Sequence, residues 1–184
     1  RSSDLDFISI YVSIDGTEFA DDLGRNFKID DFYQRIKDGA MPTTSQVNVG
    51  RYVEFFRGYA EKNIPVLYIC FTSGMSGSYQ SAMQAVELLK EDLPDAEVYV
   101  VDSLAASGGE GLIVYEAALK QQAGMSLADL HHWLEENKLT YHHWVTVDDL
   151  NHLQRGGRIS KTSAAIGGLM NIKLIITVDV EGKL

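Results

Sequence analysis

The sequence predicts an α/β fold, because strand-type and helix-type patterns alternate from about residue 64 to residue 138. Residues 66–71 form a continuous apolar run of strand length, which is typical of a strand buried on both faces. Apolar residues then recur at helical spacing as far as Leu89, and a second β-rich run follows at residues 97–101. We therefore expect a mostly parallel sheet flanked by helices.

Two elements are expected before this region. Residues 7–14 are β-rich and end at Asp15-Gly16, a pair that favours a hairpin turn. Residues 49–60 have the apolar spacing of a helix, and Asn48 stands where an N-cap belongs.

Two helices are expected after the second strand of the alternating region. Residues 107–111 read as a glycine-rich loop that leads into the first of them. Ser126 and Asp129 have the spacing of a capping box, so they predict the start of the second.

Beyond residue 140 the pattern begins again. Residues 141–147 predict a strand, and Asp148-Asp149 predict the cap of a short helix. Residues 172–178 predict a final strand.

Composition narrows the possible functions. The 184 residues carry a formal net charge of −10 and a pI of about 4.8, so nucleic acid is a poor candidate for a partner. Cys70 is the only cysteine, which excludes an intramolecular disulfide and fits a reducing compartment. No apolar stretch approaches the roughly 20 residues of a membrane helix, and no signal peptide is recognisable, so we expect a cytoplasmic protein without a membrane span.

The most informative segment for function is residues 72–78, a turn of small residues directly after the first buried strand. Ligands of open α/β sheets bind at the carboxyl ends of strands, where helix N-termini offer free N–H groups. Ser73 and Ser76 add hydroxyl groups, and Gly74 and Gly77 would let the backbone approach a ligand closely. This turn therefore suits a carboxylate or phosphate, although a capped helix start would explain it equally well.

Other polar residues have a functional and a structural interpretation. Thr44 either belongs to the cap region of the next helix or adds a second hydroxyl at the same crevice. Asp102 and Ser103 end the second strand and are interpreted first as a cap and a turn. Arg155 and Arg158 flank two glycines; taken alone they indicate a helix stop with solvated arginines, and together with a site they could hold a phosphate or meet an acidic partner.

The turn at residues 72–78, the serine-rich turn, is also a near match to the nucleophile elbow of serine hydrolases. Ser76 would be the nucleophile, and Ser78 stands where the second glycine belongs. A hydrolase needs a base and an orienting acid, and the downstream histidines have no distinctive setting. Two adjacent pairs among them lack the i, i+4 spacing of a zinc helix, so we expect no metal site. These histidines are His131, His132, His142, His143 and His152.

Read together, several segments resemble the DegV family in order and spacing from about residue 7 to the end. They are Thr44-Ser45-Gln46, residues 72–82 from Thr72-Ser73-Gly74 to Ser81-Ala82, Val101-Asp102-Ser103, Val147-Asp148-Asp149-Leu150, Leu153, Arg155-Gly156-Gly157-Arg158-Ile159-Ser160 and Ile172-Lys173. The serine-rich turn followed by the later Arg-Gly-Gly-Arg is the most specific part of the pattern.

The resemblance implies a two-domain α/β protein that binds a long-chain fatty acid between its domains. Several members are the binding subunit of a bacterial fatty acid kinase, whose separate catalytic subunit phosphorylates the carboxylate to an acyl phosphate. The motif match implies that Thr44 and Ser76 hold the carboxylate, with Ser73 as a weaker candidate. It also implies that Arg155 and Arg158 lie near the carboxylate or where the kinase docks.

The chain departs from the family pattern in some places. Val47-Asn48 stand where members usually carry Pro-Ser, the usual first strand ending in Thr-Asp-Ser is absent, and members continue well beyond this length. We therefore expect residues 1–140 to form an N-terminal α/β domain without its first strand. Residues 141–184 are expected to begin a second α/β domain that is only partly present, without much of the wall of the acyl tunnel.

A fatty acid agrees with the physical chemistry of the pattern. Each buried CH₂ of an acyl chain contributes about 0.8 kcal/mol, so affinity needs few specific contacts. We expect a lipid carrier rather than an enzyme, with the bound fatty acid as ligand and no other cofactor. A serine hydrolase or acyl transferase that uses Ser76, and a binder of another small anion, remain the alternatives.

Overall fold

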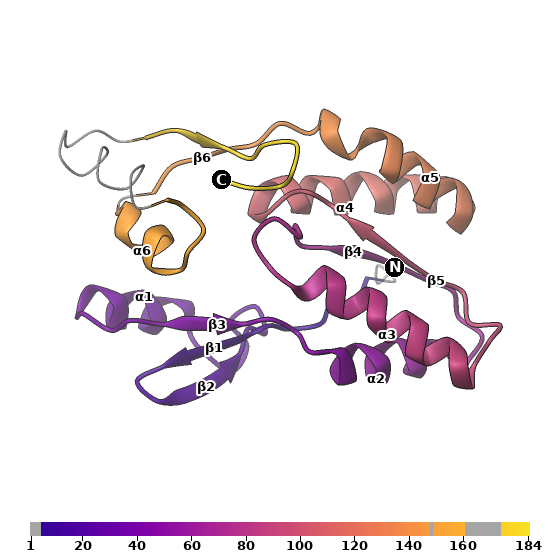
Figure 1. The fold of residues 1–184 in the computed structure, drawn as a ribbon, viewed down its shortest axis with the longest axis horizontal. Coiled ribbons are helices and arrows are strands. Elements are labelled where there is room, and N and C mark those ends of the chain that lie inside the picture. Colours follow the sequence, from indigo (N-terminus) through magenta and orange to yellow (C-terminus); the bar gives the residue numbers. More distant parts are fainter. Residues whose placement is uncertain (1–4, 148, 161–173) are drawn as a thin grey trace.

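The computed structural model describes residues 5–147, 149–160 and 174–184 (Figure 1). Its elements, in chain order, are β1 (Tyr11–Ile14), β2 (Thr17–Ala20), α1 (Ile29–Lys37), β3 (Thr43–Ser45), α2 (Val49–Ala60), β4 (Val66–Cys70), α3 (Ser78–Asp92), β5 (Val98–Asp102), α4 (Ser107–Gln122), α5 (Leu127–Asn137), the 3-10 turn η1 (Lys138–Thr140), β6 (Trp144–Val145), α6 (Leu150–Arg155) and β7 (Ile176–Thr177).

Strands β4 and β5 are the parallel pair that the sequence predicts, in register from Val66 opposite Val98 onward. Successive side chains of a strand point to opposite faces, so each face packs against its own helices. Tyr68 packs into the core shared with α2 and α3, whereas Leu67 packs into the core shared with α4 and α5. Figure 1 shows the two helix pairs on opposite sides of the strands, which confirms the expected α/β class.

Aromatic rings fill the core on the α2–α3 side. Tyr52 and Phe56 of α2 are fully buried with ring centroids 5.7 Å apart, and Tyr68 lies edge-on to both rings at 5.4 and 5.7 Å. The core on the α4–α5 side is aliphatic, with Ile113 and Leu134 fully buried. Rings of this size contribute strongly to stability through the apolar area they bury.

The predicted hairpin is present, although its first strand starts at Tyr11 rather than residue 7. Asp15 and Gly16 have φ values of 50° and 76°, the left-handed pair that a two-residue hairpin turn of type I′ requires. Strand β3 pairs antiparallel with the other edge of β1, with Thr44 opposite Val12. The cap interpretation of Thr44 is therefore wrong, because that residue belongs to a strand.

The expected loop at residues 107–111 is wrong, because α4 starts at Ser107 and contains these glycines. Gly109 is buried against the ring of His143, and a Cβ there would lie 2.5 Å from its Nδ1 atom. The glycine permits close packing between the helix and residue 143, a tertiary requirement that local sequence does not reveal.

The second region contains the expected elements in shorter form. Strands β6 and β7 pair antiparallel through Trp144 and Thr177, while residues 172–173 of the predicted last strand lie outside the described residues. Asp149 caps α6, since its carboxylate accepts a hydrogen bond from the N–H of Asn151 at 2.8 Å. Asp148 also lies outside the described residues.

Candidate functional site

A cavity of about 850 Å³ opens at the carboxyl end of β4. Its walls come from β3, the turn after β4, the first turn of α4, and α6 with the glycines that follow it. The lining residues are Ile8, Ile10, Met41, Pro42, Thr43, Thr44, Ser45, Gln46, Val47, Tyr52, Tyr68, Phe71, Met75, Ser76, Gly77, Ser78, Glu110, His152, Leu153, Arg155, Gly156 and Arg158. This is the position at which open α/β sheets bind ligands.

The sequence left two interpretations of the serine-rich turn open, a capped helix start and a ligand site, and the structure has features of both. The Ser76 hydroxyl accepts a hydrogen bond from the N–H of Ser78 at 3.2 Å and donates to the Ser78 hydroxyl at 3.0 Å, so it organises the start of α3. Ser76 also lines the cavity. Ser76 therefore organises the start of the helix and lines the cavity at the same time.

Both glycines of this turn lie close to segments that are distant in the sequence, and Gly77 also lines the cavity. A Cβ on Gly74 would lie 2.5 Å from the backbone of Gly182, and a Cβ on Gly77 would collide with the Gln46 side chain. Thr72 strengthens the first contact, since its hydroxyl donates to the Gly182 carbonyl at 2.9 Å. The turn at residues 179–183 is thus held against the end of β4.

Thr44 reaches the cavity on the antiparallel sheet. Strand β3 carries it to the wall, and its side chain is exposed. Gln46 links this segment to α3 by donating from Nε2 to the Ser81 hydroxyl at 3.3 Å. Thr44 and Ser76, which are 32 positions apart in the sequence, therefore line one space.

Both arginines of the Arg-Gly-Gly-Arg segment line the same cavity and are exposed. Arg158 donates from Nε to the carbonyl of Met75 at 3.1 Å, which fixes it to the serine-rich turn. The Arg155 guanidinium lies 2.9 Å from Nδ1 of His152. Helix α6 ends at Arg155, as the helix-stop interpretation expects, and both arginines line the same cavity as Thr44 and Ser76.

Ser73 is not among the residues that line this cavity in the described structure. Its backbone N–H donates to Asp102 Oδ1 at 3.1 Å, and the same oxygen accepts from the N–H of Leu104 at 3.2 Å. The Ser103 hydroxyl accepts from the N–H of Ala105 at 3.2 Å. Asp102 and Ser103 thus tie the ends of β4 and β5 together, as the cap-and-turn interpretation expects.

Sequence reasoning missed three polar groups inside the cavity. The hydroxyls of Tyr52 and Tyr68 lie 2.9 Å apart and satisfy each other. Burial raises the pKa of Tyr52 and of the nearby Cys70 thiol to about 12, and it also raises the pKa of Tyr68. Burial raises the pKa of Glu110 to about 7. Local sequence carries no signal for them, since a glutamate in the first turn of a helix is usual.

The geometry suits an amphipathic anion. One part of the wall presents hydroxyl and guanidinium groups, which bind carboxylates and phosphates well. Another part is apolar and aromatic, with Ile8, Ile10, Phe71 and Met75. A ligand with a carboxylate head and a hydrocarbon body would satisfy both parts.

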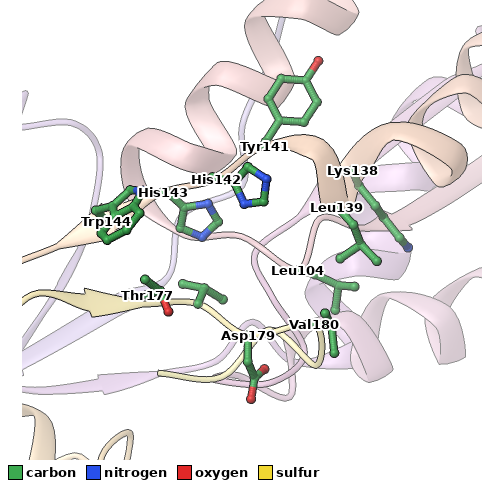
Figure 2. Close-up of a pocket in the computed structure, with 11 residues that line it drawn as sticks. Leu104, Lys138, Leu139, Tyr141, His142, His143, Trp144, Thr177, Asp179 and Val180 are labelled. Carbon is green, nitrogen blue, oxygen red and sulfur yellow. The ribbon is translucent and has the colours of Figure 1, made fainter.

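A second, smaller cavity of about 200 Å³ lies between η1, β6 and β7 (Figure 2). His142 is exposed, whereas both ring nitrogens of His143 are buried without a hydrogen-bond partner in the described part of the chain. Ring nitrogens without a partner are unsuited to a catalytic relay, which needs an orienting group.

The parts of the chain that the structure describes show few features of a metal site, a serine hydrolase site or a membrane-spanning helix. No group of three or more His, Cys, Asp and Glu side chains is arranged to hold a metal ion at residues 5–147, 149–160 and 174–184. Over the same residues, the Ser76 hydroxyl makes its hydrogen bonds with Ser78 and none with an imidazole. None of the described helices has the length and apolar character to cross a membrane.

Comparisons with known proteins agree with this geometry. The sequence model of the family described as "Uncharacterised protein, DegV family" matches residues 1–184. A DegV domain-containing protein of Clostridium perfringens is 44% identical over 184 residues, which are 100% of this chain and 63% of that protein.

Two solved structures are similar over most of this chain. A stearic-acid-binding protein from Eubacterium ventriosum has a TM-score of 0.84 and 32% identity, covering 94% of this chain and 59% of that one. The Fatty Acid Kinase (Fak) B3 protein of Streptococcus pneumoniae, solved with linoleic acid, has a TM-score of 0.82 over 96% of this chain and 61% of that one. Its 24% identity bears on the fold alone.

The chain spans less than two thirds of the length of these relatives, at 63%, 59% and 61%. Within that span, the parallel β4–β5 pair, the serine-rich turn and the Arg-Gly-Gly-Arg segment occur in the order that the sequence resemblance requires. Because the family model matches every residue, the chain belongs to the DegV family.

Proposed function

We propose that this chain binds a long-chain fatty acid and presents it to a separate kinase, which phosphorylates the carboxylate to an acyl phosphate. The observation that carries the proposal is the single cavity that combines Thr44, Ser76 and Arg158 with apolar and aromatic side chains. The stearic-acid-binding relative supports the same class of ligand. In this proposal the chain is a carrier, and the chemistry belongs to its partner.

The carboxylate is expected to lie at the Ser76 end of the cavity. Ser76 stands at the N-terminus of α3, where the helix dipole and free N–H groups favour negative charge. Its hydroxyl, which donates to Ser78, needs only to rotate to donate to a carboxylate oxygen. Thr44 supplies the second hydroxyl from the facing wall.

The hydrocarbon chain is expected to lie along the apolar wall. Each buried CH₂ contributes about 0.8 kcal/mol, so a long chain supplies most of the affinity without directional contacts. The head-group contacts then set the orientation, since a carboxylate without partners would be costly to bury.

The kinase part of the proposal draws on the two exposed arginines. Arg155 and Arg158 line the same cavity as the proposed head-group residues. Guanidinium groups there would stabilise the charge of an acyl phosphate or meet an acidic surface of the kinase.

Lipid extraction and mass analysis of the purified protein test the ligand. We expect the wild type to carry a long-chain fatty acid and a Thr44→Ala/Ser76→Ala double variant to have lost most of it. Ser73→Ala is the matched control, because Ser73 belongs to the same turn but lies off the cavity, and it should retain the lipid.

Absence of lipid from the wild type, together with no binding of added fatty acid, would contradict the proposal and favour another small anion. Covalent labelling of Ser76 by a fluorophosphonate probe would instead favour a serine hydrolase or acyl transferase.

A further inference from the structure

Glu110 is an unusual wall residue for a cavity that takes a hydrocarbon chain. It lies in the first turn of α4 and lines the large cavity. In the described part of the chain its carboxyl group has no hydrogen-bond donor and no ion-pair partner. Water in the open cavity is therefore what solvates the carboxylate when Glu110 is ionised.

None of the titratable groups that the structure describes around the cavity forms an ion pair with the carboxylate of Glu110. Tyr52 on α2 and Tyr68 and Cys70 on β4 stay neutral near physiological pH, because burial raises the pKa of each. His152 and Arg155 lie on α6, and Arg158 follows this helix. Arg155 contacts His152, and Arg158 contacts Met75 and Gly156. Neither arginine forms an ion pair with Glu110 in the described structure.

A hydrocarbon chain in this cavity would displace the water that solvates Glu110. An ionised carboxylate left against CH₂ groups without a donor is much costlier than the neutral acid. Binding of the chain therefore favours the protonated form of Glu110, and protonation favours binding to the same extent, because the coupling is reciprocal.

We propose that Glu110 links binding of the acyl chain to the uptake of one proton, so that the protein holds its fatty acid when Glu110 is protonated and releases it as Glu110 ionises. This inference rests on the proposed function, since it concerns the same cavity. It adds a specificity rule: ligands whose hydrocarbon part can donate a hydrogen bond to Glu110 depend less on pH than plain acyl chains.

Equilibrium dialysis with radiolabelled palmitate at pH 6.0 and pH 8.5 tests the linkage. Since burial raises the pKa of Glu110 to about 7, one linked proton predicts a dissociation constant about 30-fold larger at pH 8.5 than at pH 6.0. Glu110→Gln keeps the size of the side chain and removes the titration, so its ratio of dissociation constants should be close to one. Palmitate ionises equally in the experiments with the wild type and with Glu110→Gln. Its own ionisation therefore drops out when the dissociation constants of the two proteins are compared at each pH.

Glu87→Gln is the matched control, because it removes a carboxylate from the exposed face of α3 away from the cavity. It should behave as the wild type. Calorimetry of palmitate binding to the wild type, in two buffers of different ionisation enthalpy at pH 7.5, should show uptake of up to one proton and needs no variant.

Parallel pH profiles for the wild type and Glu110→Gln would overturn the linkage while leaving fatty acid binding intact. Loss of the pH dependence in His152→Gln but not in Glu110→Gln would also overturn it, and assign the effect to the imidazole. Failure of every protein to bind palmitate at either pH would instead overturn the proposed function, and the linkage with it.

Discussion

Side chains around the cavity differ in how their polar atoms are satisfied. The hydroxyls of Tyr52 and Tyr68 satisfy each other at 2.9 Å, and Ser76 is satisfied by Ser78. Glu110 has no such partner in the described structure, and burial raises its pKa from 4.5 to about 7. A half-buried acid of this kind costs stability when it is ionised.

Glu110→Gln should therefore stabilise the protein at high pH. The pKa of Glu110 is higher in the folded protein than in the unfolded chain. Its contribution to stability is therefore complete below about pH 4.5 and is lost as the pH rises through about 7. The variant has no such loss, so its advantage in free energy of unfolding should grow to at most about 3 kcal/mol at pH 8. Urea unfolding at pH 5 and pH 8 measures it; an equal difference at both values would contradict the burial of an ionisable acid.

Capping residues decide where two of the helices begin. Asn48 starts α2 by accepting the N–H of Arg51 at 3.0 Å, and Ser126 starts α5 by accepting the N–H of Asp129 at 3.2 Å. Helix α2 carries Tyr52 into the wall of the cavity and packs its aromatic face on α3. A well-defined start of α2 thus helps to define the site.

Asn48→Ala should lower the free energy of unfolding by about 1 kcal/mol, because the N–H of Arg51 loses its acceptor. Asn48→Asp is the matched control, since its carboxylate also accepts this hydrogen bond, and it should remain near wild-type stability. Thermal unfolding followed by circular dichroism measures both, and equal destabilisation of the two variants would assign the effect to something other than the cap.

At the scale of the whole molecule, the turn at residues 179–183 joins the last strand to the first parallel strand. Asp179 closes this turn by accepting N–H groups from Glu181 and Lys183 at 2.8 and 3.0 Å. The turn then lies on the end of β4, where the Thr72 hydroxyl donates to the Gly182 carbonyl. The serine-rich turn is thereby supported by the turn at residues 179–183.

Gly74→Ala should disrupt this contact, since its Cβ would meet backbone atoms of Gly182 at 2.5 Å, and backbone yields less readily than a flexible side chain. We expect a loss of about 1–3 kcal/mol and faster amide exchange at residues 179–183. Gly58→Ala is the control: the site is open and lies inside α2, so the change should stabilise by about 0.5–1 kcal/mol. Unchanged exchange at residues 179–183 in Gly74→Ala would contradict the proposed support.

Local sequence patterns were enough to predict most of the helices and strands and their order along the chain. Apolar periodicity located the strands and helices between residues 64 and 138, Asp15-Gly16 located the hairpin, and Asn48 and Ser126 located two helix starts. These features depend on interactions within a few residues, so they can be read locally. The family resemblance rested on short motifs such as the serine-rich turn and the later Arg-Gly-Gly-Arg, and it is confirmed.

Which polar residues line one cavity depends on the packed fold. It gathered Thr44, Ser76 and Arg158 around a cavity, set Ser73 aside, and turned Glu110 into a carboxyl group without a partner in the described structure. It also made Gly109 part of a helix that packs on His143. The reason is physical: burial, solvation and close approach depend on groups distant in the chain, whose positions exist only once the strands and helices have packed.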